Sequence, residues 1–391
     1  MEKKIYLAVN GLGLGHAGRS VEIANALKDR GLPVVFSSYG EAVKYISRMG
    51  YACHEVPEFP LYWGGAGEVD LKATVQYFLT SSSRIVLSQI GQEIRLLKKH
   101  RPSAVLADSR SSAMVAARLH GLPLFSLTNQ LIAYSPSHDG SKRVSGLLNF
   151  VSPRLLPRLW GLSTHVFIAD FPPPHTVSMR NIEPGLRYLR SFSFVGPLIK
   201  KQTLRRDYEE KFKAFFKDDS RPLVYAPVSG PGEDRRFFLR LLEEALPHLT
   251  DEFNIVLSKG NPGGSEQPSY RDGYAVFEWL PWRMEMINCA HILLSRAGRT
   301  TIDQAIVLRK PVILVPASKQ TEQEENARRV SELGIGLCLE QGKFSKESLR
   351  ITIQKMMRDY DFYLGNLDLL ARRAVELGGV EKIVDTLLQQ L

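Results

Sequence analysis

A histidine surrounded by glycines stands near the N-terminus, in the run GLGLGHAGR from Gly11 to Arg19. Glycines such as Gly13 and Gly15 let the backbone approach a ligand closely, and the helix that follows offers free amide groups to an anion. The run also fits the G-x-G-x-x-G loop of dinucleotide-binding proteins, but the next expected strand ends in Ser37-Ser38-Tyr39, without the acidic residue of that fingerprint. We therefore interpret His16 as a general base or an anion ligand. The alternative is a histidine that only caps or packs the helix start.

An aspartate follows an apolar run in the first half of the chain, in Ala107-Asp108-Ser109-Arg110. Asp108 stands at the expected carboxyl end of a strand, which is where open α/β sheets bind their ligands. It is therefore the second candidate for the group that takes a proton. An equally good interpretation is that Asp108 caps the helix expected over Ser109–His120.

Small and cationic residues follow an apolar run in the second half of the chain, from Ser295 onward. A glycine and two hydroxyls at a strand-to-helix turn suit a pyrophosphate on the helix N-terminus, and two arginines would add charge-assisted hydrogen bonds. The predicted phosphate contacts are Arg296, Gly298, Arg299, Thr300 and Thr301. Gln304, further along the same helix, is placed for ribose hydroxyls. The alternative is an ordinary turn with solvent-facing arginines.

These residues would be positioned by strands that alternate with helices along nearly the whole chain. Ten short apolar runs predict strands, namely Lys4–Val9, Pro33–Ser37, Ala104–Asp108, Leu124–Leu127, Val166–Asp170, Leu223–Val228, Asn254–Ser258, Ala275–Trp279, Ile292–Ser295 and Val312–Pro316. Most are apolar throughout, as in parallel strands covered on both faces, and the alternation predicts doubly wound α/β sheets.

A highly charged stretch after Lys200 interrupts this alternation. We expect a linker around Gly196–Arg206 between two domains, residues 1–199 and 200–391. Helices without intervening strands are expected from Ser345 to the end of the chain, with the alternative that the last helix crosses back to the first domain.

The bulk composition is that of a globular protein with a positive charge balance. The 391 residues include 51 Lys+Arg and 41 Asp+Glu, a formal net charge of +10. No run of about 18 apolar residues predicts a membrane-spanning helix, and the N-terminal apolar run is too short for a signal peptide, so we expect a cytoplasmic protein. Three scattered cysteines predict neither a disulfide framework nor a zinc site. The positive charge favours an anionic partner: nucleic acid, a membrane surface or a phosphorylated substrate.

One segment combines positive charge with apolar residues. Residues 141–161, SKRVSGLLNFVSPRLLPRLWG, place Lys and Arg among Leu, Phe and Trp at helical spacing, as in a helix that lies on an anionic bilayer. Pro153 and Pro157 are expected to break this helix into short pieces. The alternative is a pair of core helices with a basic outer face.

The run from Trp279 to Ala327 resembles the donor-nucleotide half of GT-B glycosyltransferases. It is similar to glycosyltransferase family 28, of the N-acetylglucosaminyl transferase type, and to archaeal proteins related to that family. Trp279-Leu280-Pro281 matches the family's Trp-x-Pro segment, which places the base of the nucleotide. Thr301 matches a phosphate-binding hydroxyl, and Gln304 takes the place of a ribose-binding Glu. Arg296 stands where related plant and animal enzymes have a phosphate-contacting His.

Two further segments share this resemblance. Gln323, preceded by Glu322, matches a Gln near the donor sugar. Ser229-Gly230-Pro231-Gly232 matches the family's second glycine-rich turn, close to the donor phosphates. The loop from Gly11 to Arg19 matches the N-terminal glycine loop, which meets the acceptor and the reacting centre through residues such as Gly13, Gly15 and Arg19.

The resemblance implies a GT-B fold, with two doubly wound Rossmann-like α/β domains facing a central cleft. The first domain would bind the acceptor and the second the nucleotide sugar, a substrate rather than a cofactor. A sugar would pass with inversion, and without a metal, from a nucleotide-diphosphate sugar such as a UDP-sugar to a hydroxyl of a lipid-linked acceptor. His16 would take the acceptor proton, with Asp108 as the second choice. An enzyme with such an acceptor would be peripheral on the inner face of the membrane and would contact its anionic surface.

Two other functions remain open at this point. The run from Gly13 to Arg19 also fits the G-x-G-H-x-x-R loop of UDP-sugar hydrolases on the same fold, in which the histidine would activate water. A nucleic-acid-binding protein would explain the charge, but no stacking motif or known nucleic-acid module is present, so we expect no nucleic-acid partner.

Overall fold

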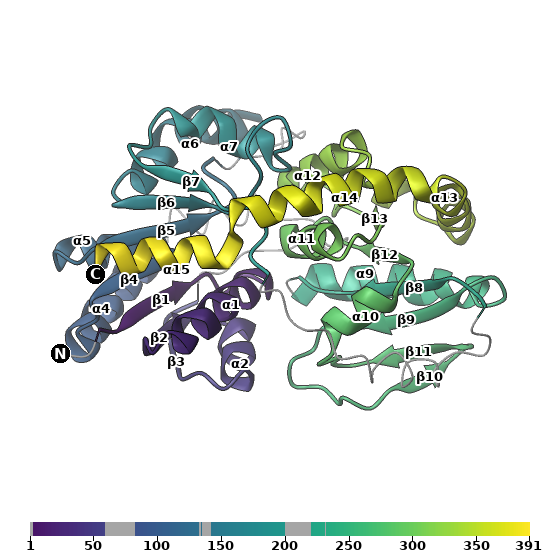
Figure 1. Cartoon of the computed structure of the whole chain (residues 1–391), viewed down its shortest axis with the longest axis horizontal. Coiled ribbons are helices and arrows are strands. Elements are labelled where there is room, and N and C mark those ends of the chain that lie inside the picture. The colour runs from purple at the N-terminus through teal and green to yellow at the C-terminus, as the bar shows by residue number, and fades with distance from the viewer. Residues whose placement is uncertain (1–2, 59–82, 133, 135–141, 200–219, 231) are drawn as a thin grey trace. The chain divides into compact units, whose positions relative to one another are not determined.

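The computed structural model describes residues 3–58, 83–132, 134, 142–199, 220–230 and 232–391. The chain forms two compact units (Figure 1). Unit 1 takes the described residues up to 199 together with Ala374–Leu391, and unit 2 takes those from Ser220 to Arg373. Residues 200–206 of the expected linker lie outside the described residues, as do Ser141 of the basic-apolar segment and Pro231 of the second glycine-rich turn.

Unit 1 is built on a seven-stranded sheet in the order β3-β2-β1-β4-β5-β6-β7. Its strands are β1 Ile5–Val9, β2 Val34–Ser38, β3 Cys53–Glu55, β4 Ala104–Asp108, β5 Leu124–Thr128, β6 His165–Ile168 and β7 Phe192–Phe194. Its helices are α1 Gly15–Asp29, α2 Glu41–Arg48, α4 Ser83–His100, α5 Ser111–Leu119, α6 Lys142–Trp160, α7 Met179–Leu186 and α15 Gly379–Gln390. All neighbouring strands are parallel, and every residue of β1, β4 and β5 is buried because helices cover both faces (Figure 1).

Unit 2 has a second seven-stranded sheet, in the order β10-β11-β9-β8-β12-β13-β14. Its strands are β8 Leu223–Pro227, β9 Asn254–Ser258, β10 Ser269–Arg271, β11 Tyr274–Phe277, β12 Ile292–Ser295, β13 Val312–Leu314 and β14 Gly336–Cys338. Its α-helices are α9 Gly232–Ala245, α10 Arg283–Cys289, α11 Arg299–Val307, α12 Thr321–Glu332 and α13 Lys346–Arg358, and the two 3₁₀-helices are Leu246–Leu249 and Gln341–Lys343. Helix α14, Tyr360–Leu377, begins in unit 2, and its residues from Ala374 belong to unit 1.

The ten predicted strands are all present, with ends that differ by at most two residues. Four short edge strands are not among these ten, namely β3, β7, β10 and β14, because three residues are too few to show a pattern. Strand β10 pairs antiparallel with β11, whereas the prediction was of parallel strands. The expected run of helices after Ser345 is confirmed as α13, α14 and α15.

Helix α6 corrects the expectation that its prolines would divide it. The helix is continuous from Lys142 to Trp160, with Pro153 and Pro157 inside it. A proline removes one backbone donor and crowds the preceding turn. The arginine after each proline donates from its guanidinium to the carbonyl four residues earlier, Arg154 to Phe150 and Arg158 to Arg154. Both bonds lie one residue away from the carbonyls that lose their donor to proline, and the helix continues through these positions.

The C-terminal helix α15 packs on α1 within unit 1 (Figure 1). Val380, Ile383, Val384 and Leu387 share one hydrophobic core with residues of α1 and β1. At its surface, Arg30 at the end of α1 pairs with Glu381 at 2.6 Å and with Asp385 at 2.5 Å. Exposed ion pairs contribute little, so burial of the apolar face is the main attachment.

We predict that Leu387→Ala destabilises unit 1 by about 2–5 kcal/mol, because it leaves a cavity in this core. The neighbouring Leu388 is 36% exposed, against 0% for Leu387, and Leu388→Ala is the matched control. Urea-induced unfolding of the full chain, read at the transition of unit 1, measures both. Equal effects of the two substitutions would show that α15 is not held by its buried face.

Candidate active site

The glycine loop of unit 1 joins the carboxyl end of β1 to α1. Gly11 must be a glycine because a Cβ there would overlap the carbonyl oxygen of Tyr39, and Gly13 has φ +70°, in the left-handed region. Helix α1 starts at Gly15, after an N-cap at Leu14 that makes no side-chain cap hydrogen bond. His16 therefore does not cap this helix.

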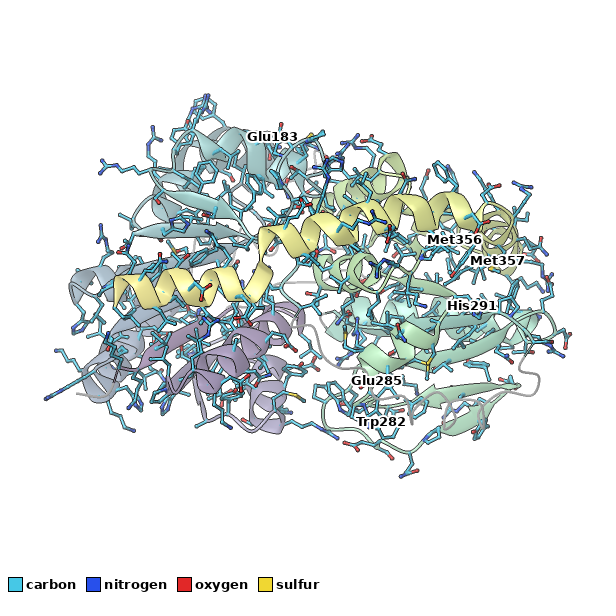
Figure 2. The ribbon with its side chains drawn as sticks, in the orientation of Figure 1. Glu183, Trp282, Glu285, His291, Met356 and Met357 are labelled. Carbon is cyan, nitrogen blue, oxygen red and sulfur yellow. The ribbon has the colours of Figure 1, made fainter. Side chains whose placement is uncertain are left out.

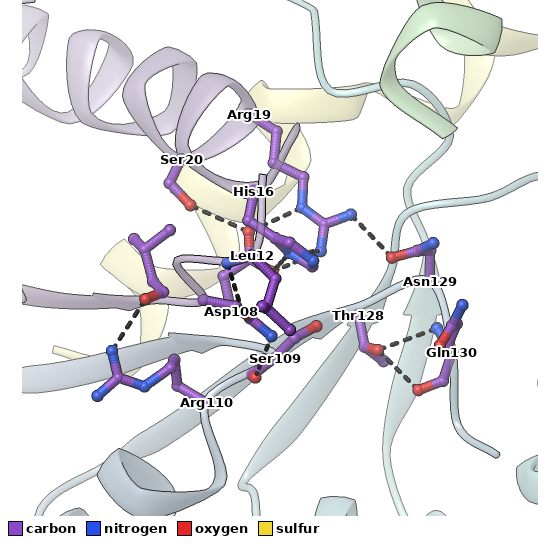
Figure 3. Close-up of polar contacts among 12 residues, drawn as sticks. Leu12, His16, Arg19, Ser20, Asp108, Ser109, Arg110, Thr128, Asn129 and Gln130 are labelled. Carbon is purple, nitrogen blue, oxygen red and sulfur yellow. Dashed lines mark hydrogen bonds and ion pairs between the residues drawn. The ribbon is translucent and has the colours of Figure 1, made fainter. Parts of the chain in front are cut away.

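The side chain of His16 instead meets Asp108, at the carboxyl end of the neighbouring strand β4 (Figure 3). His16 Nδ1 lies 2.8 Å from Asp108 Oδ1. Arg19, one turn further along α1, donates from Nε to Asp108 Oδ2 at 2.7 Å and from Nη2 to Oδ1. Ser20 Oγ donates to Oδ2 at 3.0 Å. The two elements that sequence reasoning singled out in unit 1 are thus brought together around one carboxylate.

The position of the His16 proton follows from these contacts. Arg19 Nη2 also lies 3.0 Å from His16 Nδ1, so that nitrogen faces both a donor and an acceptor. An unprotonated Nδ1 would set its lone pair against a charged carboxylate oxygen, whereas a protonated Nδ1 donates to that oxygen. Arg19 already donates to both carboxylate oxygens of Asp108, so the loss of a hydrogen bond to His16 Nδ1 costs it little. The neutral ring therefore carries its proton on Nδ1, which leaves Nε2 as the acceptor. The His16 side chain is 22% exposed.

Asp108 is buried and saturated with donors, which decides between its predicted roles. Burial alone would raise its pKa, but the positive charge of Arg19 and the close contacts with Arg19 and His16 outweigh burial and hold the pKa well below its usual range. Such a carboxylate is a poor base near neutral pH. The N-cap interpretation is wrong, since α5 starts at Ser111 after an N-cap at Arg110. The contacts instead suit a residue that orients His16.

Arg19 was expected in the loop that meets the acceptor, but its guanidinium is buried against the protein. Besides Asp108 it bonds Asn129 Oδ1 through Nη1 at 3.2 Å. Asn129 follows β5, so Arg19 links α1 to the carboxyl ends of two strands. This arrangement makes Arg19 part of the support of His16 and not a surface cation.

A second buried network, which the sequence did not reveal, holds the end of β1, where the glycine loop begins. Arg110, two residues after Asp108, donates to Glu93 of α4 at 2.7 Å and to the carbonyl of Val9 at 2.9 Å. Tyr6 of β1 donates to Glu93 at 2.6 Å. Arg110 stands in the run around Asp108 but was not singled out, and Glu93 lies in a polar helical stretch where nothing distinguishes it from a solvated residue.

In unit 2 the predicted phosphate-binding residues lie at the carboxyl ends of β8 and β12. Ser229 and Gly230 follow β8 and are half-buried, and Gly230 has φ +126°. Gly298, half-buried, is the N-cap of α11, and Thr300 lies in its first turn. Strands β8 and β12 are neighbours in the sheet, so these two turns share one edge.

Arg296, a predicted phosphate contact, is buried and committed to the protein. Its Nη2 bonds Asp234 Oδ1 of α9 at 2.6 Å, its Nη1 bonds the Val315 carbonyl at 3.0 Å, and its guanidinium lies 4.4 Å from the ring centre of Phe238. Burial raises the pKa of Asp234, and the charge of Arg296 offsets this only in part. The pair ties together the segments that follow β8, β12 and β13. These contacts give Arg296 a positioning role in place of the predicted phosphate contact.

Arg299 is also buried, and it pairs with Asp303 one turn later at 2.7 Å. Thr301 and Gln304 are joined by a residue that the sequence did not single out. Arg283, at the start of α10, donates from Nη2 to Thr301 Oγ1 at 3.0 Å and from Nε to Gln304 Oε1 at 3.1 Å. Its position just after the Trp279–Trp282 segment is the one sequence signal that could have drawn attention to it.

The remaining predicted donor residues fall in the same region of unit 2. Trp279 and Leu280 follow β11 and are largely buried. Gln323 is buried in the first turn of α12, and its Oε1 accepts from the Ala317 amide at 2.9 Å, which fixes the loop after β13. Glu322, beside it, is half-buried.

Two family models match this chain. Residues 233–366 match the glycosyltransferase family 28 C-terminal domain, and residues 3–156 match a glycosyl transferase family 1 model. An uncharacterized glycosyltransferase of Methanosarcina acetivorans is 25% identical over 97% of this chain and 96% of its own. The UDP-N-acetylglucosamine--N-acetylmuramyl-(pentapeptide) pyrophosphoryl-undecaprenol N-acetylglucosamine transferase of Clostridium tetani is 23% identical over 98% of this chain and 97% of its own.

Solved structures agree in fold over the full length. The spinosyn rhamnosyltransferase has a TM-score of 0.67 at 16% identity, covering 98% of this chain and 99% of its own. The calicheamicin glycosyltransferase has a TM-score of 0.66 at 15% identity, covering 100% and 98%. The two seven-stranded sheets and these matches define the GT-B class. The chain is a GT-B glycosyltransferase that carries a glycosyltransferase family 28 C-terminal domain.

We predict that Asp234→Ala destabilises unit 2 by about 3–5 kcal/mol, because it leaves the charge of Arg296 buried and unpaired. Glu233, the preceding residue, pairs with Arg236 at the surface, and Glu233→Ala should cost no more than about 1 kcal/mol. Thermal unfolding monitored at the transition of unit 2 gives both values. A small effect of Asp234→Ala would mean that Arg296 is free to turn toward a ligand.

Proposed function

We propose that this enzyme transfers a sugar, with inversion, from a nucleotide-diphosphate sugar to an acceptor hydroxyl, with a UDP-sugar as the first donor to test. The observation that carries the proposal is the His16–Asp108 pair: His16 Nδ1 lies 2.8 Å from a buried carboxylate whose pKa is held well below its usual range, an arrangement that leaves Nε2 of the neutral ring as the acceptor. The Clostridium tetani relative is named for a UDP-sugar donor, and a Streptomyces sp. SF2575 glycosyltransferase of the same fold has been solved with thymidine diphosphate (TM-score 0.64, 16% identity, 99% of each chain).

In the proposed step, His16 Nε2 takes the proton of the acceptor hydroxyl as its oxygen attacks the anomeric carbon. The bond from that carbon to the phosphate oxygen breaks, and the nucleoside diphosphate leaves with the electron pair. The imidazolium that forms is stabilised by Asp108, which lies 2.8 Å from Nδ1 and is already ionised. Unit 2 would bind the donor through the turns at Ser229–Gly230 and Gly298–Thr301, where backbone amides meet the leaving phosphates.

We predict that His16→Ala lowers turnover by at least about a hundredfold and leaves nucleotide affinity unchanged, because it removes the proton acceptor only. Transfer from UDP-sugars is followed by mass spectrometry, and nucleotide affinity by calorimetry. His248 is exposed on the 3₁₀-helix Leu246–Leu249 of unit 2, so His248→Ala is the control. Near-normal turnover of His16→Ala would remove His16 from the mechanism.

The same assay separates transfer from hydrolysis. A hydrolase would use His16 to activate water and would release free sugar at its full rate without an acceptor. A transferase would need an acceptor for its full rate, and the mass of that acceptor would increase by the mass of one sugar residue. Full-rate sugar release without acceptor would replace the transferase proposal by the hydrolase.

We further propose that the acceptor is lipid-linked and that unit 1 meets an anionic membrane surface along α6. On the outer side of α6, Phe150 is 59% exposed and Leu155 60% exposed, and the guanidinium of Arg154 lies 3.9 Å from the ring centre of Phe150. Apolar side chains framed by cations are typical of helices that lie in a bilayer interface. Within the described residues, every helix is too short or too polar to cross a bilayer.

We predict that Leu155→Asp abolishes sedimentation with liposomes that contain phosphatidylserine, because it places a negative charge where the helix would enter the interface. Leu119, on α5, is 69% exposed, and Leu119→Asp is the matched control, expected to bind as the wild type does. No sedimentation of the wild-type protein, or equal losses in the two variants, would argue that α6 is an ordinary basic surface.

A further inference from the structure

The arginines of the predicted donor site differ in how their charge is compensated. Arg296 is paired with Asp234, and Arg299 with Asp303. Arg283, half-buried at the start of α10, bonds within the described part of the chain only the neutral side chains of Thr301 and Gln304. Among the residues that the structure describes, it forms no ion pair. The charge of Arg283 is therefore the one in this trio that no carboxylate neutralises.

The contacts of Arg283 also fix what its two partners can offer. Arginine only donates, so Thr301 Oγ1 and Gln304 Oε1 must both be accepting. The hydroxyl proton of Thr301 then remains available as a donor, and the Gln304 amide turns its NH₂ group away from Arg283. Arg283 Nη1 takes part in no hydrogen bond within the described ranges. This corner of α10 and α11 thus presents hydrogen-bond donors and a positive charge.

The corner lies where the family motifs place the nucleotide. Arg283 directly follows Trp282, which Figure 2 shows at the start of α10, and α10 packs on α11. Thr301 and Gln304 lie on the first two turns of α11, after Gly298. A donor-rich, positively charged corner beside a helix N-terminus suits phosphate oxygens, and a guanidinium can bind them bidentately.

We propose that Arg283 is a specificity-determining residue of the donor site, which binds the diphosphate of the nucleotide, holds Thr301 as a donor toward it and leaves the NH₂ group of Gln304 as a donor toward the neighbouring ribose. The proposal rests on the proposed function of unit 2. It assigns to Arg283 the phosphate-binding charge that Arg296 and Arg299, both buried in ion pairs, do not supply. It also accounts for a glutamine at position 304. The amide of Gln304 accepts from Arg283 and leaves the positive charge in place, whereas a glutamate would neutralise that charge.

The test compares the affinities of the full-length protein for UDP, UMP and uridine by calorimetry, with dTDP, GDP and ADP and their monophosphates and nucleosides as the other base series. Arg283→Met keeps the length of the side chain and removes its charge. We expect it to weaken diphosphate binding about tenfold to a hundredfold, the monophosphate less, and the nucleoside hardly at all. Arg283→Lys should retain part of the affinity because it keeps the charge but loses the fork.

Arg309 pairs with Asp368 at the surface just after α11, and Arg309→Met is the control that should bind as the wild type does. If Arg283→Met left diphosphate binding unchanged, the role assigned to Arg283 would be overturned, and the proposed function of unit 2 would stand. Equal weakening of diphosphate, monophosphate and nucleoside would overturn it too, because that pattern means that Arg283 only supports the fold. No binding of any nucleoside diphosphate to the wild type would overturn the proposed function as well.

Discussion

The buried carboxylate of Asp108 is the constraint on which unit 1 of this enzyme depends. A charge removed from water must be compensated at close range, and here two arginine nitrogens, a serine hydroxyl and an imidazole do so. These three side chains, His16, Arg19 and Ser20, all come from the first two turns of α1. The requirement therefore docks the start of α1 on the end of β4, and it holds the His16 ring in one orientation.

Buried charges are also paired in unit 2, but there the pairing removes two arginines from the set that could bind a ligand. The Arg296–Asp234 pair joins the loops after three strands, and the Arg299–Asp303 pair stabilises the start of α11. Both arginines looked like ligand cations in the sequence, but buried charges are paired, and these two are used inside the protein. Among the residues that the structure describes, Arg283 contacts only neutral side chains, which leaves its charge available to an anionic ligand.

Much of the fold followed from the sequence, because buried parallel strands are apolar throughout and stand out between helices. Three-residue strands such as β10 could not be found this way, and the continuity of α6 through Pro153 and Pro157 runs against the tendency of proline to interrupt a helix. Of the candidate site, the motifs located His16, Asp108 and Thr301. The partners of Arg19 and Arg296 lie 89 and 62 residues away, so their roles appear only once the chain is folded.

The measurement that tests the account most directly is the protonation state of the His16 ring. Histidine-selective ¹⁵N labelling of the full-length protein, with His16→Gln to assign the signal, distinguishes the two neutral tautomers by their nitrogen shifts and couplings. We expect that neutral His16 carries its proton on Nδ1, that Nε2 is free, and that Asp108→Asn disturbs this state. A neutral ring protonated on Nε2 in the wild type would contradict this expectation, because Arg19 would then be the donor to Nδ1 and the proposed base would already hold a proton.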